Sequence, residues 1–352
     1  MVALDVVHAS NARLRELGPD LVALFVGGTS GIGEFTLKAF VQNTISPRVY
    51  LVGRNASAAD RIIKECRELN KEGKVEFLKA DVTELKEVDL VCKEIQKREK
   101  KINLLFQTQG NLTLNGRNEN PEGLDRKFTL NYYSRMRFVY NLLPQLRTAS
   151  AEPPHFSRTL SVLGAGHEGA INLTDLDLKT TFSGARCAAH TIVMNDFMAE
   201  EFAAREHGIS FLHTSPGVVN TGLTRELPIW ARALMKVATP LLSLFFVSAD
   251  ETGQRQLFLA SSGIYPPAKP AQGAPLAAGV PFPKDFSVSK GSNGKVGSGA
   301  YLVNWNGDIS GNEKILSDYR EKGVGKTVWE HTMGIFKQVE KINQGGIDSA
   351  TS

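Results

Sequence analysis

The chain has 352 residues, with 41 basic and 37 acidic side chains and a formal net charge of +4. Because acids and bases are interspersed, this balance argues against nucleic acid or an anionic surface as the main partner. The length suits one large domain, and no linker divides it, so we expect a single domain over residues 1–352. Three scattered cysteines and a start that does not read as a signal peptide favour a cytoplasmic protein with no disulfide framework and no metal site.

After a short predicted helix within residues 1–20, one stretch organises the rest of the chain. Leu21–Val26 is an apolar run of strand length, typical of a strand buried on both faces. Gly27, Gly31 and Gly33 follow it, and a helix is predicted from residue 32. Glycines allow a tight turn and a close approach of backbone to a diphosphate, and the free N–H groups of a helix start favour an anion. This stretch therefore predicts a dinucleotide-binding turn.

The wording of this turn, Gly-Gly-Thr-Ser-Gly-Ile-Gly at residues 27–33, resembles the cofactor loop of the short-chain dehydrogenase/reductase family. The resemblance covers residues 20 to about 260 firmly. It implies a doubly wound, mostly parallel α/β domain of the Rossmann type, with the cofactor at the carboxyl ends of the strands. The turn residues that it implies for cofactor binding are Gly27, Thr29, Ser30, Gly31, Ile32 and Gly33.

A cation follows the second predicted strand, Arg48–Val52. This strand ends in Gly53-Arg54-Asn55, where NAD-binding relatives usually place an acid that holds the ribose hydroxyls. A guanidinium can instead hold a 2′-phosphate through two parallel hydrogen bonds. We therefore predict NADP(H) as the cofactor, with Arg54 as the residue that recognises the phosphate and Asn55 beside it.

The resemblance implies further cofactor contacts at the ends of later strands, predicted at residues 75–80, 102–106 and 209–214. The segment Gln107-Thr108-Gln109-Gly110 stands where relatives have Asn-Asn-Ala-Gly, which indicates that this site departs from the family pattern. The residues implied to contact the cofactor are Asp81 and Val82 along the adenine, Thr108 and Gly110, and then Pro216, Gly217, Val219 and Thr221 near the nicotinamide amide and the diphosphate.

Two catalytic positions of the family have counterparts here. Asn131, in a long helix predicted at residues 123–146, matches the Asn that holds a water in the family's proton relay. Ser161, near the end of a strand predicted at residues 158–163, matches the catalytic Ser that hydrogen-bonds a substrate oxygen. The neighbouring Tyr132 and Tyr133 are predicted as core aromatics.

The family's catalytic Tyr and Lys, four residues apart on the next helix, are missing. At that spacing both side chains share one helix face, so the ammonium can hold the nicotinamide ribose and lower the Tyr pKa. No Tyr occurs between Tyr140 and Tyr265. The segment from Tyr265 to Lys269 contains two prolines and cannot be a helix interior, so we treat it as an accidental match.

Three alignments of this helix remain open, and none restores both groups. They place at the two positions Phe182 and Arg186, Arg186 and His190, or Ala188 and Ile192, and we prefer the third because it needs no insertion inside a helix. Loss of a positioned acid costs ~10²–10⁴ in rate, so a substrate that is already polarised, such as an iminium or a conjugated enone, is favoured. The candidate replacements are His167, Arg186, His190 and Ser161.

The remaining segments predict a substrate side and a C-terminal extension. Residues 21–221 would form the cofactor-binding core, and residues 222–247 the family's apolar substrate lid, interrupted by Arg232, Lys236 and Pro240 so that no membrane span is expected. Residues 262–299 read as a surface loop excursion, followed by a last strand and helices over residues 300–341, where the wording is similar to fungal members that act in specialised metabolism, related to the retinol-dehydrogenase-like branch. Because relatives commonly pair through two long helices, a homodimer stays open.

We expect an NADP(H)-dependent reductase that delivers hydride to a preactivated C=C, C=N or C=O bond of a hydrophobic metabolite. The alternatives are a non-redox isomerase, dehydratase or cyclase on the same scaffold, or a nucleotide-binding protein without turnover.

Overall fold

One parallel sheet forms the centre of the computed structural model, which describes residues 1–219, 228–230, 232, 246–284 and 286–348. Its strand order is β3-β2-β1-β4-β5-β6-β7. The strands are β1 (Val22–Val26), β2 (Arg48–Gly53), β3 (Lys74–Lys79), β4 (Leu104–Gln107), β5 (Arg158–Val162), β6 (Ser210–Thr214) and β7 (Ala300–Val303). The doubly wound α/β fold expected from the sequence is confirmed.

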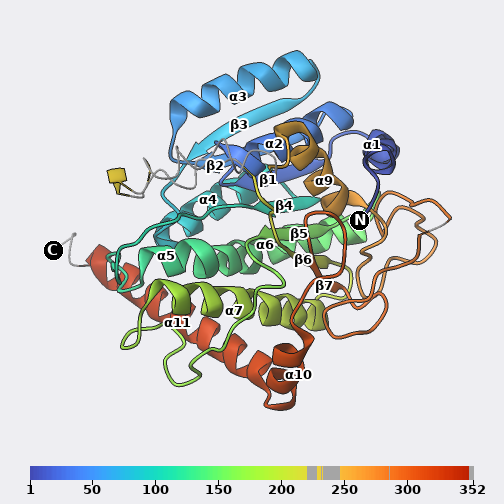
Figure 1. Cartoon of the computed structure of the whole chain (residues 1–352). Helices are drawn as coiled ribbons and strands as arrows, with labels where there is room; N and C mark the ends of the chain where they lie inside the picture. The colour runs from blue at the N-terminus through green and yellow to red at the C-terminus, as the bar shows by residue number, and fades with distance from the viewer. Residues whose placement is uncertain (220–227, 231, 233–245, 285, 349–352) are drawn as a thin grey trace.

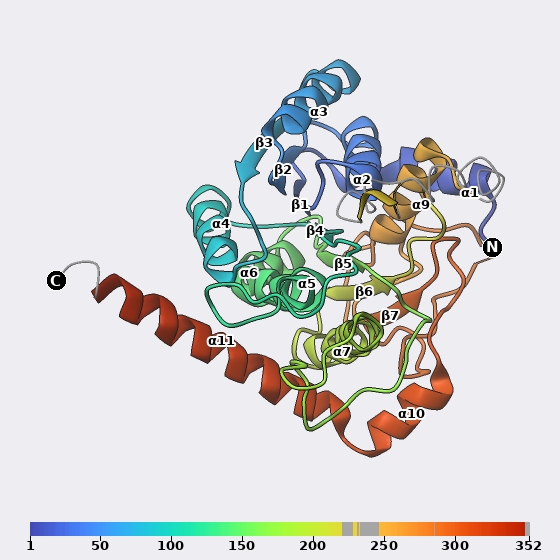
Figure 2. The ribbon, with the colours of Figure 1, turned by 60° about the vertical axis from the view of Figure 1, so that its left-hand side comes forward.

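Helices cover both faces of the sheet (Figure 1, Figure 2). They are α1 (Leu4–Ala12), α2 (Gly31–Asn43), α3 (Ala56–Leu69), α4 (Leu85–Arg98), α5 (Arg126–Phe128), α6 (Ser134–Ala151), α7 (Gly184–Arg205), α9 (Ala249–Ser261), α10 (Glu313–Glu321) and α11 (Val324–Asp348). None of the helices in the described part of the chain combines the length and apolarity that a membrane crossing requires.

Side chains of β1 alternate between two hydrophobic cores. In β1, Val22, Leu24 and Val26 pack into the core shared with α4, α6, α7 and α11. Ala23 and Phe25 pack into the core shared with α1, α2, α3 and α9. This period of two, with both faces buried, explains why β1 reads as a continuous apolar run rather than as alternating apolar and polar residues.

The winding direction reverses between β1 and β4, which pair with each other while β2 and β5 lie on their outer sides. At such a reversal the connections leave the carboxyl ends of the two strands in opposite directions and open a crevice between them. The glycine turn after β1 and the Gln107–Gly110 segment after β4 therefore meet at this edge of the sheet.

The C-terminal helix α11 lies along α7 and α4 on one side of the molecule (Figure 2). Trp329 packs edge-on against Phe202 of α7, with ring centroids 5.3 Å apart, and the Arg205 guanidinium lies 3.9 Å from the Trp329 ring centre. Glu340 forms an ion pair of 2.9 Å with Arg137 of α6. Trp329 thus joins the extension to the core.

The long helix expected at residues 123–146 is interrupted. A π-helical turn, Thr129–Tyr133, separates α5 from α6 and contains Asn131. Such turns insert one extra residue per turn and are frequent at functional sites. Tyr132 and Tyr133 are buried as expected, and their hydroxyls pair with Thr332 and His331 of α11 at 2.5 and 2.8 Å.

Candidate functional site

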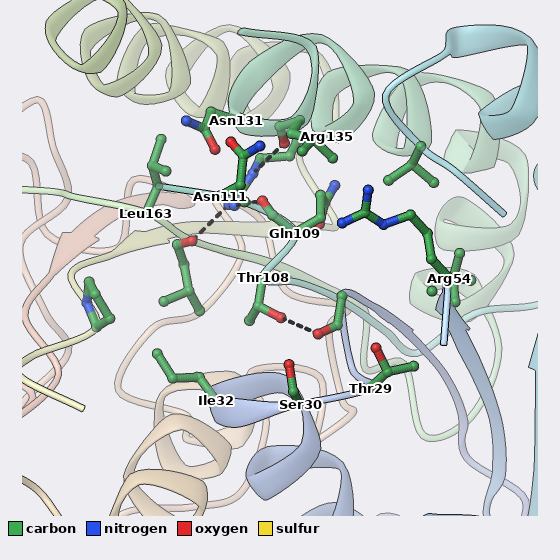
Figure 3. Close-up of a pocket in the computed structure, with 18 of the residues that line it drawn as sticks. Thr29, Ser30, Ile32, Arg54, Thr108, Gln109, Asn111, Asn131, Arg135 and Leu163 are labelled. Atoms are coloured by element: carbon green, nitrogen blue, oxygen red, sulfur yellow. Dashed lines mark hydrogen bonds between the residues drawn. The ribbon is translucent and has the colours of Figure 1, made fainter. Parts of the chain in front are cut away.

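A cavity of about 390 Å³ opens at the carboxyl ends of the strands (Figure 3). Most of the residues expected to contact a cofactor line it. These are Gly27, Thr29, Ser30, Ile32, Arg54, Asn55, Asp81, Val82, Thr108, Gly110, Pro216, Gly217 and Val219. Gly31 and Gly33 lie in the same turn at the start of α2, and Thr221 lies outside the described residues. The structure therefore gathers in one place residues that are spread over two hundred positions of sequence.

The glycine turn packs so closely against neighbouring backbone that a Cβ does not fit at two of its glycines. Gly27 has φ of +83°, and a Cβ there would lie 2.5 Å from the Gln109 nitrogen. A Cβ on Gly33 would lie 2.8 Å from Gly28 Cα and 2.9 Å from the Gly27 oxygen. Gly31, with φ of +61°, begins α2, and its neighbours Ser30 and Ile32 line the cavity. These positions fit a bound diphosphate, because the free amides of a helix start attract an anion.

A charged pair marks one end of the cavity. Arg54 Nη1 lies 3.9 Å from Asp81 Oδ2, and both side chains are substantially exposed. Asn55 caps α3, since its side-chain oxygen accepts a hydrogen bond of 3.1 Å from the Ala58 amide. The exposed guanidinium thus lies at the ends of β2 and β3, at the edge of the cavity where the sequence predicted a 2′-phosphate.

The other end lies at β4, β5 and β6, where Asn131 and Leu163 are placed away from Arg54 (Figure 3). A Cβ on Gly110 would lie 3.1 Å from Asn131 Oδ1. Gly217 has φ of +71°, and its missing Cβ would lie 2.7 Å from the indole ring of Trp305. Trp305, just after β7, thus supports the Pro216-Gly217 loop, a contact that the sequence did not indicate.

Ser161 lies beneath the cavity rather than on its lining. Its side chain is buried on the face of β5 that packs against α6 and α7, where it accepts a hydrogen bond of 2.7 Å from Arg135 Nη1 and donates one of 3.1 Å to Asn195 Oδ1. Asn195 Nδ2 in turn donates to the Asn131 carbonyl at 3.0 Å. The β5 residues that line the cavity are instead Val162 and Leu163.

Of the three alignments considered for α7, the preferred one brings a residue against the end of β5. Ile192 Cδ1 would lie 2.9 Å from a Cβ on Gly164. Ala188, one helical turn earlier, is exposed. Neither side chain can donate a proton or hold a ribose hydroxyl, so this alignment restores neither group of the family's pair.

The other candidate replacements are not among the described residues that line the cavity. His190 is buried and accepts a hydrogen bond from the Asn172 amide at 2.9 Å through Nε2, and its Nδ1 lies 3.2 Å from the Leu176 carbonyl. Burial lowers the pKa of His190, which fits a neutral ring that holds the loop between Asn172 and Leu176 through these two contacts. Arg186 is exposed and donates to the Thr181 carbonyl at 2.9 Å, and His167 is exposed in the turn after β5.

A second buried histidine supports the strand ends. His213 of β6 accepts the Gly164 amide hydrogen through Nε2 at 3.2 Å, and its Nδ1 lies 2.5 Å from Asp196 Oδ1. Burial, with a smaller contribution from the Arg135 charge, lowers the pKa of His213 to about 3. The neutral ring therefore fixes the backbone of Gly164 just after β5.

Arg135 is the titratable residue of the described lining that sequence reasoning missed. It lies one helical turn after Asn131, a spacing that places two side chains on one helix face and that could have indicated it. The titratable side chains among the described lining residues are Arg54, Asp81 and Arg135. In the described part of the chain, no group of three or more His, Cys, Asp or Glu side chains is arranged to hold a metal ion.

Comparisons with known proteins agree with this arrangement. Residues 21–152 match the family model described as short chain dehydrogenase. Oxidoreductase AN1596 of Emericella nidulans is 43% identical over 342 residues, which cover 96% of this chain and 99% of that protein. Short-chain dehydrogenase/reductase SAT2 of Stachybotrys chartarum is 31% identical over 364 residues, covering 97% and 99%.

Among solved structures, an alcohol dehydrogenase from the archaeon Thermococcus sibiricus, complexed with 5-hydroxy-NADP, matches the fold with a TM-score of 0.51 at 16% identity. The match covers 69% of this chain and 90% of that chain. The fold, the glycine-walled cavity and the full-length fungal relatives lead to one conclusion: the chain belongs to the short-chain dehydrogenase/reductase family.

Proposed function

We propose that the protein is an NADP(H)-dependent reductase that delivers hydride to a preactivated C=C, C=N or C=O bond of a hydrophobic specialised metabolite. One observation carries the proposal: a glycine-walled cavity at the strand ends with Arg54 at its β2 end. When bound, the reduced cofactor supplies the hydride at its nicotinamide. The complex of a structural relative with 5-hydroxy-NADP and the names of the fungal relatives support the assignment.

The preference for the phosphorylated cofactor rests on the charge at the end of β2. Arg54 follows Gly53 directly, in the position from which an acid would contact the ribose hydroxyls of NAD. Its Nη1 lies 3.9 Å from Asp81 Oδ2, and the planar guanidinium carries five N–H groups in all. A phosphate can take two of them in parallel, which adds both energy and orientation.

The restriction to an activated substrate rests on the chemistry of the opposite end. The described lining residues there are Leu130, Asn131, Arg135, Val162, Leu163, Pro216 and Gly217, and Arg135 is the ionisable one among them. Hydride addition to a plain ketone would leave an alkoxide without a positioned acid, at a cost of ~10²–10⁴ in rate. An iminium or a conjugated enone needs that proton less. Leu130, Val162 and Leu163 make this end apolar, which supports a hydrophobic substrate.

The test is a spectroscopic assay of NADPH consumption with a panel of hydrophobic iminium, enone and simple ketone compounds. We expect consumption with the activated compounds and little with the simple ketones. Consumption of NADPH with simple ketones at a comparable rate would contradict the proposed substrate class.

The lack of a Tyr, Lys or His on the described lining also favours a second candidate. In it, the scaffold performs an isomerisation, dehydration or cyclisation while the bound nucleotide is not consumed, or it binds the nucleotide without turnover. Conversion of a substrate with the NADPH concentration unchanged would support this candidate over the reductase.

We also infer a cytoplasmic location, which the three buried, unpaired cysteines support because a reducing compartment keeps thiols free.

A homodimer is compatible with the family, but α11 packs on α7 and joins α6 through the Arg137–Glu340 ion pair. Relatives commonly pair through two long helices, and here α11 covers part of α6 and α7. We therefore infer that a homodimer of this protein would form through another face.

A further inference from the structure

Arg135 is a buried cation without an anionic partner. Its side chain is 1% exposed, and all of its hydrogen bonds go to neutral acceptors. Nη1 donates to Ser161 Oγ at 2.7 Å and to the Val162 carbonyl at 2.9 Å, and Nη2 donates to the Gln109 carbonyl at 2.5 Å. No carboxylate among the described residues pairs with it. A buried charge without an ionic partner destabilises the fold, so a purely structural role does not readily account for an arginine at this position.

A second buried arginine shows what a purely structural role looks like in this fold. Arg158 of β5 donates from Nη1 to the Leu259 and Ser262 carbonyls and from Nη2 to the Tyr265 and Ala278 carbonyls, at 2.6–3.1 Å. Every N–H bond of its two terminal nitrogens is therefore used, and it does not appear among the described lining residues of the cavity. It fastens the segment after α9 to the sheet.

Arg135 differs from Arg158 in both respects. It lines the cavity, and its Nη2 has one acceptor among the described residues, although that nitrogen carries two N–H bonds. The glycine at position 110 leaves the space beside it open, since a Cβ there would lie 3.9 Å from Nη2. In Figure 3 the guanidinium lies with Asn131 and Gln109 on the side of the cavity across from the Thr29-Ser30 turn.

The position of Arg135 along the cavity decides what it would meet. Arg54 lies at the ends of β2 and β3, and the glycine turn lies at the end of β1. Arg135 reaches the ends of β4 and β5, through Gln109 and Val162. A dinucleotide with its 2′-phosphate at Arg54 and its diphosphate at the turn therefore has its nicotinamide half at the Arg135 end.

We propose that Arg135 is the positive charge at the nicotinamide end of this site: it donates its remaining Nη2 hydrogen to a ligand oxygen there and makes the cavity prefer reduced over oxidised nicotinamide nucleotide. The proposal rests on the nucleotide binding proposed above. It gives the site a cation from α6, whereas Arg186, which two of the α7 alignments place at a position of the family's pair, is not among the described lining residues.

The preference follows from charge. Oxidation of the nicotinamide ring converts a neutral group into a cation, and two like charges in a partly buried site repel each other. Burial lowers the pKa of Arg135 to about 9, so the guanidinium stays protonated at neutral pH and the repulsion persists. The same charge favours a substrate in which hydride addition to carbon moves the π electrons onto oxygen, because that oxygen becomes negative.

The test compares the dissociation constants of NADP⁺ and NADPH by calorimetry, which requires no substrate and no turnover. For the wild-type protein we expect NADPH to bind more tightly by about tenfold, which corresponds to about 1.4 kcal/mol. Arg135→Met, which removes the charge and keeps an extended apolar side chain, should bring the ratio close to one. Arg135→Lys should keep most of the preference, since the charge remains.

Arg158→Met is the matched control, because it removes a buried, unpaired arginine that the structure places away from the cavity. It should lower the melting temperature and leave the ratio of affinities unchanged. If Arg135→Met does not fold, Arg135→Gln takes its place.

An equal affinity of the wild-type protein for both nucleotides would overturn the proposal, as would a ratio that Arg135→Met and Arg135→Gln leave unchanged. In both of these cases nucleotide binding, and with it the proposed function, would stand. Failure of both nucleotides to bind the folded wild-type protein would overturn the two proposals together.

Discussion

Replacement of Gly33 by Ala tests the packing of the glycine turn. Gly33 belongs to α2, and a Cβ there would lie 2.6 Å from Thr108 Oγ1, 2.8 Å from Gly28 Cα and 2.9 Å from the Gly27 oxygen. Two of these three atoms are backbone, which cannot rotate away. The new methyl group must therefore push the start of α2 away from the turn after β1.

The magnitude follows from two opposing effects. Overpacking of this kind costs about 1–3 kcal/mol, whereas Ala in place of Gly inside a helix gains about 1 kcal/mol. Gly334 of α11 separates the two, because it is exposed and a Cβ there would meet no heavy atom within 4 Å. Gly334→Ala should therefore show the helix gain alone, and the difference between the two variants should equal the packing cost, about 1–3 kcal/mol.

The assay is urea unfolding of both variants, followed by calorimetric titration with NADPH. Gly33→Ala should also lower the affinity for NADPH by at least about tenfold, because the helix amides move away from the diphosphate. Gly334→Ala should leave the affinity unchanged. Equal unfolding free energies for the two variants, with NADPH affinity intact in Gly33→Ala, would refute the close approach described at this turn.

Three further predictions concern Arg54, Asp175 and Trp329. Arg54→Ala should weaken NADPH by about tenfold in calorimetry and leave NADH unchanged, and an equal loss for both nucleotides would contradict a role in phosphate recognition. Burial alone would raise the pKa of Asp175, but hydrogen bonds from Thr181 and Thr180 lower it to about 2. Its carboxylate therefore contributes stability that is complete above about pH 4 and is lost as the pH falls toward 2, so Asp175→Asn should cost about 1–2 kcal/mol in urea unfolding at pH 7 and progressively less on acidification. A cost that does not depend on pH would contradict this. Trp329→Ala should destabilise the fold by about 2 kcal/mol in the same assay, less than a fully buried Trp would, while NADPH affinity stays unchanged; a large loss of affinity would show that α11 acts on the cavity.

Much of the fold was predictable because the local signals agreed with one another. The apolar run of β1, the glycines after it and the amphipathic helices that follow all indicate the same alternation of strand and helix, and the structure has it with boundaries shifted by one to three residues in most elements. The interruption of the helix predicted at residues 123–146 was not visible, since a π-helical turn changes hydrogen bonding without a distinctive residue pattern.

The site was predictable at positions where backbone geometry requires glycine. It was less predictable at positions whose role depends on the direction and the contacts of a side chain. Close backbone contacts require glycine at positions 27 and 33, and a glycine-rich motif in the sequence indicates such contacts. Ser161 could be placed on a strand, but its direction depends on where β5 begins and ends: side chains alternate, and the structure turns Ser161 toward α6 and α7 while Val162 lines the cavity. Its catalytic role stays a prediction. The spacing from Asn131 could have placed Arg135 on the cavity side of its helix, but the carbonyls that surround its guanidinium come from the segments after β4 and at the end of β5 and are visible only in the structure.

The central claim is that the turn after β1 binds the diphosphate of a phosphorylated nicotinamide nucleotide. Calorimetric titration of the folded wild-type protein with NADPH and NADH tests it most directly. We predict saturable binding of NADPH that is at least about tenfold tighter than that of NADH, with a matching rise in melting temperature. Absence of heat and of thermal stabilisation with both nucleotides would contradict the claim.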